Sequence, residues 1–268
     1  MVVVDMHCHA GQSWFEPVEV LLSHMDRSGV AHAVLHQFIG MYFNDYILDC
    51  ARRHPDRLRA VVMVDLSDEN APDTLEELAG QGAAGVRFMA TARVAGDDPL
   101  ALWQRAEKLG LVISCVGMLK DFIDPAFAEG IAAVPKTPVL IEHLAGIGQT
   151  GKPPYDDFRQ ALKLAEYPNT YIKVGGLGEI AARPDPLGAQ YEPPTPPPYI
   201  EMARDAFGAD RMMWGSDSPV SSGREGYHNV LKGVAEYPGL DDEQRKWVLG
   251  GTALKLFDFG GETKADAT

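Results

Sequence analysis

Short apolar runs alternate with longer amphipathic stretches along the whole chain, and this alternation restricts the possible folds more than any other feature. Continuous runs rich in valine, leucine and isoleucine are typical of parallel strands that are buried on both faces. We predict such strands at residues 2–6, 33–37, 59–64, 85–88, 111–116, 138–142, 170–174 and 212–215. Helices are predicted between and after them, at residues 17–28, 44–53, 73–81, 100–109, 124–133, 155–165, 199–207 and 241–249.

Eight strands that alternate with helices predict an α/β fold, a (β/α)8 TIM barrel in a single domain. The length of 268 residues suits one such barrel. An open, doubly wound sheet is the main alternative, but no Gly-x-Gly-x-x-Gly follows the first predicted strand. We expect the barrel to span residues 1–258, with a proline-rich loop at 183–198 that is either a stiff surface loop or a substrate-contacting lid. Residues 259–268 are expected to form a flexible tail.

Composition narrows the range of partners. The formal net charge of -14 argues against nucleic acids and anionic membranes, and no apolar run is long enough to cross a membrane. The 3 cysteines are scattered, which argues against a disulfide framework and favours the cytoplasm. We therefore expect a small-molecule substrate, and the sequence leaves open whether the chain forms a homo-oligomer.

The first predicted strand ends in a pattern that suits chemistry, with Asp5, His7 and His9 at every second position. Side chains at alternate positions of a strand share a face, so these three groups are expected to point the same way. Two imidazoles and a carboxylate can bind a divalent metal, or can polarise a carbonyl and act as a base. The alternative is a strand that ends in two histidines at an exposed turn. Cys8 lies on the opposite face and is expected to be a packing residue.

Polar residues also follow other predicted strands. Arg87 ends the fourth strand, His143 follows the sixth, and Asp217 follows the eighth. The carboxyl ends of barrel strands form one face, where the active sites of such barrels lie. Each residue alone is more often a core or turn residue, but their occurrence at corresponding strand ends predicts a shared site.

These motifs resemble the amidohydrolase superfamily. The resemblance rests on Asp-x-His-x-His at 5–9 and Gly-Ser-Asp-x-Pro at 215–219, and it is closest to the amidohydrolase-related branch, which contains lactonases and decarboxylases. It implies that His7, His9, His143 and Asp217 bind a divalent metal, zinc or alternatively manganese. It also implies that Asp217 takes a proton from the attacking water, that His143 orients substrate or water, and that Arg87 grips a substrate carboxylate or hydroxyl.

One departure from the family pattern leaves the metal open. Metal-dependent members usually carry a histidine or a carboxylated lysine at the end of the fourth or fifth strand. Here the fourth strand ends in Arg87, and residues 112–117 of the fifth read Val-Ile-Ser-Cys-Val-Gly. The branch also contains lactonases that need no metal. If no metal is bound, the resemblance implies that His7 and His9 polarise the substrate carbonyl directly.

Further polar residues are weaker candidates. His228, after the eighth predicted strand, and Asn44, after the second, are candidate substrate contacts. Lys173, near the end of the seventh strand, is either a site residue or a solvated or paired lysine. His36 is expected to pack or to hydrogen-bond to the backbone.

The resemblance favours a hydrolase that opens a lactone of a small polar or carboxylated metabolite with a water activated by Asp217. No organic cofactor is expected. The alternative on the same barrel is a lyase, a metal-dependent decarboxylase or hydratase. A barrel that binds a ligand without turnover is a third possibility.

Overall fold

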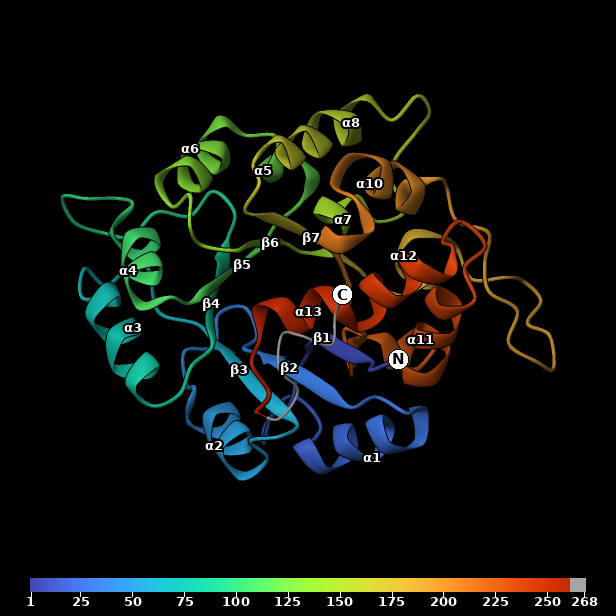
Figure 1. Ribbon diagram of the computed structural model, residues 1–268, viewed down its shortest axis with the longest axis horizontal. Coiled ribbons are helices and arrows are strands. Elements are labelled where there is room, and N and C mark those ends of the chain that lie inside the picture. The colour runs from blue at the N-terminus through green and yellow to red at the C-terminus, as the bar shows by residue number, and fades with distance from the viewer. Residues whose placement is uncertain (261–268) are drawn as a thin grey trace.

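The structure is a computed structural model, and it describes residues 1–260. Within this range the chain forms one parallel eight-stranded sheet in which each strand pairs with the next in sequence (Figure 1). The strands are β1 (Val4–Cys8), β2 (His32–His36), β3 (Leu58–Val62), β4 (Gly85–Met89), β5 (Val112–Val116), β6 (Val139–Ile141), β7 (Thr170–Val174) and β8 (Met212–Trp214). All eight overlap the predicted strands.

The last strand returns to the first, which nearly closes the sheet into a barrel. Just beyond β8, the backbone N–H of Asp217 donates to the carbonyl of His7 at 2.8 Å. The N–H of His9 in turn donates to the carbonyl of Ser218 at 2.7 Å. These bonds confirm the predicted single-domain barrel, and they bring two of its polar motifs together at the carboxyl end.

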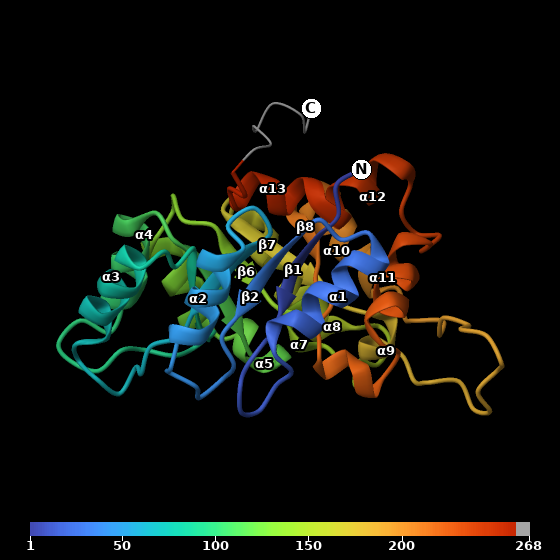
Figure 2. The ribbon, with the colours of Figure 1, turned by 90° about the horizontal axis from the view of Figure 1, so that it is seen from below.

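Helices surround the barrel (Figures 1 and 2). Eight of them overlap the predicted helices: α1 (Val18–Ser28), α2 (Asp45–Arg53), α3 (Ala71–Gly80), α4 (Ala101–Leu109), α6 (Pro125–Ala133), α8 (Asp156–Leu162), α10 (Tyr199–Phe207) and α12 (Asp242–Lys246). The prediction missed α5 (Leu119–Phe122), α7 (His143–Gly146), α9 (Leu177–Ile180), α11 (Tyr227–Ala235) and α13 (Thr252–Leu256). Short 3-10 turns lie at Lys163–Glu166, Ala209–Arg211 and Val220–Gly223, and a π turn at Trp247–Gly251.

The core has two parts. The larger part lies between the strands and the helices, and it includes Phe88, Trp103 and Phe127. The smaller part fills the amino-terminal half of the barrel with one or two residues from several strands, namely Val4, Met6, Val34, Val61, Val112, Leu140 and Met213. Helix α13 lies across this end of the barrel (Figures 1 and 2), and Ala253 packs against the same cluster.

Phe259 is buried against the inner cluster, and its ring stacks on His32 with centroids 4.4 Å apart, so the first residue of the predicted tail is packed. Residues 261–268 of that tail lie outside the described residues. Cys8, Cys50 and Cys115 are buried free thiols, as a packing role predicts. Among the described residues no helix is both long and apolar enough to cross a membrane.

Candidate active site

The side chains inside the barrel change from apolar to polar along several strands, from one inward-facing residue to the next. Leu140 of β6 is followed two residues later by Glu142, Val112 of β5 by Ser114, and Val34 of β2 by His36. Because alternate residues of a strand share a face, the second residue of each pair lies above the first. The amino-terminal half of the barrel is thus packed with hydrocarbon, and the carboxyl-terminal half holds buried polar groups: His7, His36, Arg87, Ser114, Glu142 and Lys173.

Strand β1 departs from this simple alternation. Its pairing register with β2 shifts between Asp5 and Cys8, and Met6 packs inside the barrel. Asp5 instead accepts a hydrogen bond from the backbone N–H of Ser216 at 2.8 Å. Burial and the neighbouring Asp5 carboxylate raise the pKa of Tyr227, which belongs to the outer core. The prediction that Asp5 shares a face with the two histidines is therefore wrong, because the irregular register of β1 turns Asp5 away from them.

His7, His9 and Asp217 meet at the carboxyl end of the barrel. The Nε2 atoms of His7 and His9 lie 3.7 Å and 3.5 Å from the same oxygen, Oδ1 of Asp217. His9 Nδ1 donates to the carbonyl of His36 at 2.8 Å, which leaves His9 Nε2 as the lone-pair nitrogen. Both ring nitrogens of His7 are buried, and neither has a hydrogen-bond partner among the described residues. The sequence prediction thus placed these three residues together correctly.

The backbone holds Asp217 in an uncommon conformation. Its φ of 56° lies in the left-handed region, which aspartate tolerates better than most residues. Gly215, two residues before Asp217, allows His7 and Lys173 to approach the backbone closely, because a Cβ there would lie 2.7 Å from the Cβ of His7 and 3.2 Å from Cε of Lys173. Strained backbone is common at functional sites, where the surrounding structure enforces it.

His143 begins a left-handed turn, not a regular helix. Its φ is 54°, and the two residues after it also have positive φ. A Cβ on Gly146, which ends the turn, would lie 2.3 Å from the carbonyl of Gly117, so the turn packs directly on the backbone after β5. His143 Nδ1 donates to Glu179 Oε1 at 2.8 Å. Lys173 Nζ lies 3.0 Å from the same nitrogen, which places this buried lysine among the groups of the site.

The charges of the site hold its carboxylates in the ionised state. Burial alone would raise the pKa of Asp217, but the positive charge of Lys173 lowers it well below the usual range. Burial is likewise outweighed at Glu179, where His143 and Lys173 lower the pKa to about 2. Burial and then Lys173 lower the pKa of His7, so its imidazole is neutral at physiological pH. A neutral imidazole beside an ionised carboxylate can bind a cation or accept a proton.

The charge of Arg87 is already paired inside the barrel. Arg87 forms a bidentate pair with Glu142, with Nε at 2.8 Å and Nη2 at 2.7 Å from the two carboxylate oxygens. Its Nη1 donates to the carbonyl of Gln37 at 2.9 Å. Ser114 Oγ donates to the same carboxylate. The expectation that Arg87 grips a substrate carboxylate or hydroxyl therefore needs correction for the carboxylate, because Glu142 already neutralises this arginine inside the barrel.

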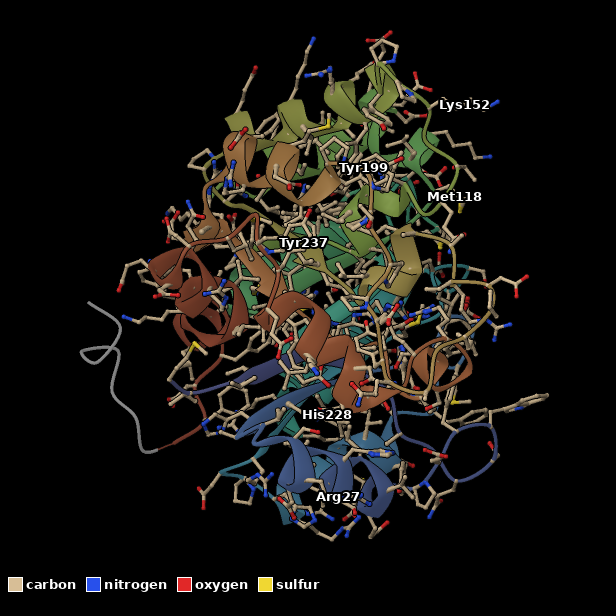
Figure 3. The ribbon with its side chains drawn as sticks, turned by 90° about the vertical axis from the view of Figure 1, so that its right-hand side faces the viewer. Arg27, Met118, Lys152, Tyr199, His228 and Tyr237 are labelled. Atoms are coloured by element: carbon tan, nitrogen blue, oxygen red, sulfur yellow. The ribbon has the colours of Figure 1, made fainter. Side chains whose placement is uncertain are left out.

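The two weaker substrate candidates are also placed differently from the prediction. The amide of Asn44 is fully used, since it donates to the carbonyls of Tyr42 and Met63 and accepts from the N–H of Met63. His228 is exposed in the first turn of α11, beside Arg27 of α1 (Figure 3). The sequence prediction missed α11, and that helix carries His228 to the outer surface.

Sequence reasoning did not select Glu142, Glu179 or Arg224. Glu142 stands directly before His143, and its position after an apolar strand was an available signal. Glu179 lies in α9, a one-turn helix that no periodicity revealed. Arg224 Nη2 lies 3.4 Å from Asp217 Oδ2, and Arg224 also lines a cavity of about 460 Å³ under the proline-rich loop. Tyr191 of that loop donates to Glu225 at 2.9 Å, which fastens the loop beside the site.

The donor atoms are suitably grouped for a metal ion. Three overlapping sets have ligand atoms that lie within 4.8 Å of one another: His7, His9 and Asp217; His7, Glu142 and His143; and His143, Glu179 and Asp217. The first set matches the chemistry of a catalytic zinc site, which uses three protein ligands and keeps one position open. Its unpartnered His7 nitrogens fit a cation that would satisfy them. The hydrogen bond from His9 to the carbonyl of His36 is the kind of outer contact that orients a metal-binding histidine.

Comparison with known proteins places this arrangement in a family. A family model described as "Amidohydrolase" matches residues 4–259. The chain belongs to the amidohydrolase family. It is 30% identical to L-fucono-1,5-lactonase of Burkholderia ambifaria over 248 residues, which cover 86% of this chain and 81% of that protein. It is 27% identical to 4-sulfomuconolactone hydrolase of Hydrogenophaga intermedia, with coverages of 90% and 79%.

Solved structures of similar shape support the fold. A putative 2-pyrone-4,6-dicarboxylic acid hydrolase from Pseudomonas putida superposes with a TM-score of 0.78 at 22% identity, covering 97% of this chain and 99% of that one. Family membership confirms the resemblance that the sequence motifs carry, and with it the prediction that this amidohydrolase is an enzyme.

Proposed function

We propose that this amidohydrolase hydrolyses the ester bond of a lactone, with Asp217 as the base that takes the proton of the attacking water. The observation that carries the proposal is the meeting of one ionised carboxylate oxygen with the Nε2 atoms of His7 and His9, at 3.7 Å and 3.5 Å. Two relatives that match most of the chain carry the word lactonase or lactone in their names, which supports this reaction.

The chemistry can be assigned to individual groups. Asp217 takes a proton from water while the water oxygen bonds to the lactone carbonyl carbon, and the carbonyl oxygen becomes an oxyanion. The buried Lys173 ammonium supplies positive charge at this end of the barrel for that oxyanion. The ring C–O bond then breaks, and its oxygen leaves with a proton from His143. Glu179, which accepts from His143 Nδ1 at 2.8 Å, orients the imidazole for this transfer. The product is the open-chain hydroxy acid.

We also propose that His7, His9 and Asp217 hold a zinc ion. Two imidazoles and a carboxylate favour zinc over manganese, which prefers an all-oxygen environment. Bound there, zinc would lower the pKa of a water molecule and polarise the carbonyl. His143 belongs to the two neighbouring donor sets, and we assign it to proton transfer because its Nδ1 is already bonded to Glu179.

Replacing Asp217 with asparagine tests the proposal. The substitution keeps the shape of the side chain but removes its basicity, so the kcat for lactone opening should fall by about 10²–10⁴-fold. The thermal unfolding midpoint should stay close to that of the wild type. Lactones of several ring sizes would be assayed with and without added zinc, and NMR would identify the product. Retention of more than a tenth of the activity by Asp217→Asn would refute the assignment, and release of CO2 from carboxylic acids would favour the lyase alternative.

A further inference from the structure

Exposed large apolar side chains gather at the end of the barrel that holds the site. Apart from Met1, every such side chain among residues 1–260 lies at or beyond the carboxyl end of a strand: Trp14, Phe38, Ile39, Tyr42, Phe43, Met89, Met118, Leu187 and Val220. Figure 3 shows Met118 at this edge of the molecule. A concentration of exposed apolar groups around a polar site is characteristic of a binding surface.

Two aromatic rings of this region contact the site directly. The ring of Phe15 stacks on His9 with centroids 5.5 Å apart, and the ring of Phe38 meets His9 edge-on at 5.7 Å. The two phenylalanine rings also touch each other, with centroids 4.8 Å apart. Phe38 remains 38% exposed, so part of its ring faces solvent beside the catalytic groups. We call Phe15 and Phe38 the aromatic wall.

The loop that carries Phe38 is fixed to the barrel. Gln37 accepts from the N–H of Phe38 at 2.9 Å and donates to the carbonyl of Phe43 at 2.6 Å. Asn44 holds the end of the same loop through its bonds to Tyr42 and Met63. A ring held in this way presents its apolar surface without losing much conformational entropy on binding. The aromatic wall is therefore a preformed feature of the site.

The charge distribution argues against a carboxylate at this wall. Arg87, a buried arginine inside the barrel, is already paired bidentately with Glu142. Its remaining Nη1 donates to Gln37, at the base of the loop that carries Phe38. A carboxylate placed against the wall would thus be desolvated without gaining a free cationic partner from Arg87. An apolar group would gain by leaving water there.

We propose that the substrate is a lactone with an apolar substituent, which packs on Phe15 and Phe38 while the ring ester reaches Asp217. This inference rests on the proposed lactonase function and makes its substrate class more specific. It is an alternative to the polar or carboxylated metabolite expected from the sequence. The aromatic wall, in this view, determines specificity and takes no part in the bond-breaking steps.

Binding to a catalytically silent protein tests the wall separately from the reaction. Calorimetric titrations of Asp217→Asn would compare δ-nonalactone, which carries a butyl group, with unsubstituted δ-valerolactone. We expect binding of δ-nonalactone to be about ten-fold tighter or more, since each buried methylene strengthens binding several-fold. Phe38→Ala and Phe15→Ala, added singly, should remove most of this difference. Equal affinity for the two lactones would overturn the inference even if the enzyme proves to be a lactonase.

Kinetic measurements on the enzyme with Asp217 intact provide a second test. The kcat/KM for δ-nonalactone should exceed that for δ-valerolactone and for D-glucono-1,5-lactone, and Phe38→Ala should lower only the first by about ten-fold. The control is His228→Ala, which should leave all three kcat/KM values unchanged, since His228 is exposed on the outer surface in α11. An equal loss toward all three lactones on Phe38→Ala would overturn the inference.

The two hypotheses fail in different ways. If no lactone is turned over but Asp217→Asn binds the butyl lactone through the aromatic wall, the proposed reaction fails and the binding preference stands. Sedimentation analysis of the wild type tests whether the exposed apolar side chains instead form a dimer interface. We expect a monomer to bind the apolar lactone, whereas a dimer that covers Phe38 and excludes δ-nonalactone would overturn the inference.

Discussion

Removing the charge of Glu142 should destabilise the whole barrel, because it isolates a buried arginine. Arg87 is 3% exposed and Glu142 is fully buried, and two short hydrogen bonds join them. Glu142→Gln keeps the volume but places an amide NH2 where Arg87 needs an acceptor. Breaking a buried ion pair by changing one partner typically costs about 3–5 kcal/mol, since an uncompensated charge remains in the interior.

Urea denaturation measured by far-UV circular dichroism would give the change in the free energy of unfolding. In a thermal scan of a chain of this size, a loss of about 3 kcal/mol lowers the midpoint by roughly 6–12 °C. The control is Glu243→Gln, which breaks the exposed pair with Lys246 and should leave the midpoint unchanged. The double variant Arg87→Met with Glu142→Leu should recover stability relative to Glu142→Gln, because no unpaired charge remains.

The same pair gives a pH dependence with a definite sign. Burial would raise the pKa of Glu142, but the charge of Arg87 lowers it well below the ordinary value of 4.5. The unfolded chain therefore binds more protons than the folded one below pH 4.5, and the stabilisation is lost as the pH falls. The difference between wild type and Glu142→Gln should shrink over that range. A destabilisation of less than about 1 kcal/mol at pH 7 would refute the reasoning, because it would mean that Arg87 finds other solvation.

Three further outcomes follow from the site. Gly215→Ala should lower the free energy of unfolding by about 1–3 kcal/mol, because the added Cβ clashes with the His7 side chain. Gly80→Ala has open space around the new Cβ and should not destabilise the protein. Equal unfolding midpoints for the two variants would contradict this prediction. Burial lowers the pKa of His36 to about 3, so between pH 7.5 and 5.5 its imidazole binds a proton in the unfolded chain but not in the folded one. Over this range the free energy of unfolding of the metal-free wild type should therefore fall by about 1.4 kcal/mol more than that of His36→Phe, as measured by urea titration. Zinc binding measured by competition with a chelating dye should weaken by about ten-fold or more in His9→Ala and stay unchanged in His228→Ala, and similar affinities in both would exclude His9 as a ligand.

The sequence was sufficient for the order of the strands and for part of the site. Buried parallel strands leave continuous apolar runs, and all eight appear as strands in the structure. His7, His9, His143 and Asp217 follow such runs directly, so the barrel topology alone brings them to one end. Helix α11 escaped prediction, and it carries His228, a predicted substrate contact, onto an exposed helical turn.

Local periodicity determined which residues reach the end of the barrel, whereas only the tertiary structure decided what each one faces. The register shift in β1 turns Asp5 away from the histidines, which strict alternation could not reveal. Glu142, 55 positions from Arg87 in sequence, neutralises that arginine and prevents it from binding a substrate carboxylate. Pairing between strands that are distant in sequence sets such partners, and it depends on barrel closure, which no short stretch of sequence encodes. The sequence thus supplies the reactive groups, and the folded barrel determines which partners each of them contacts.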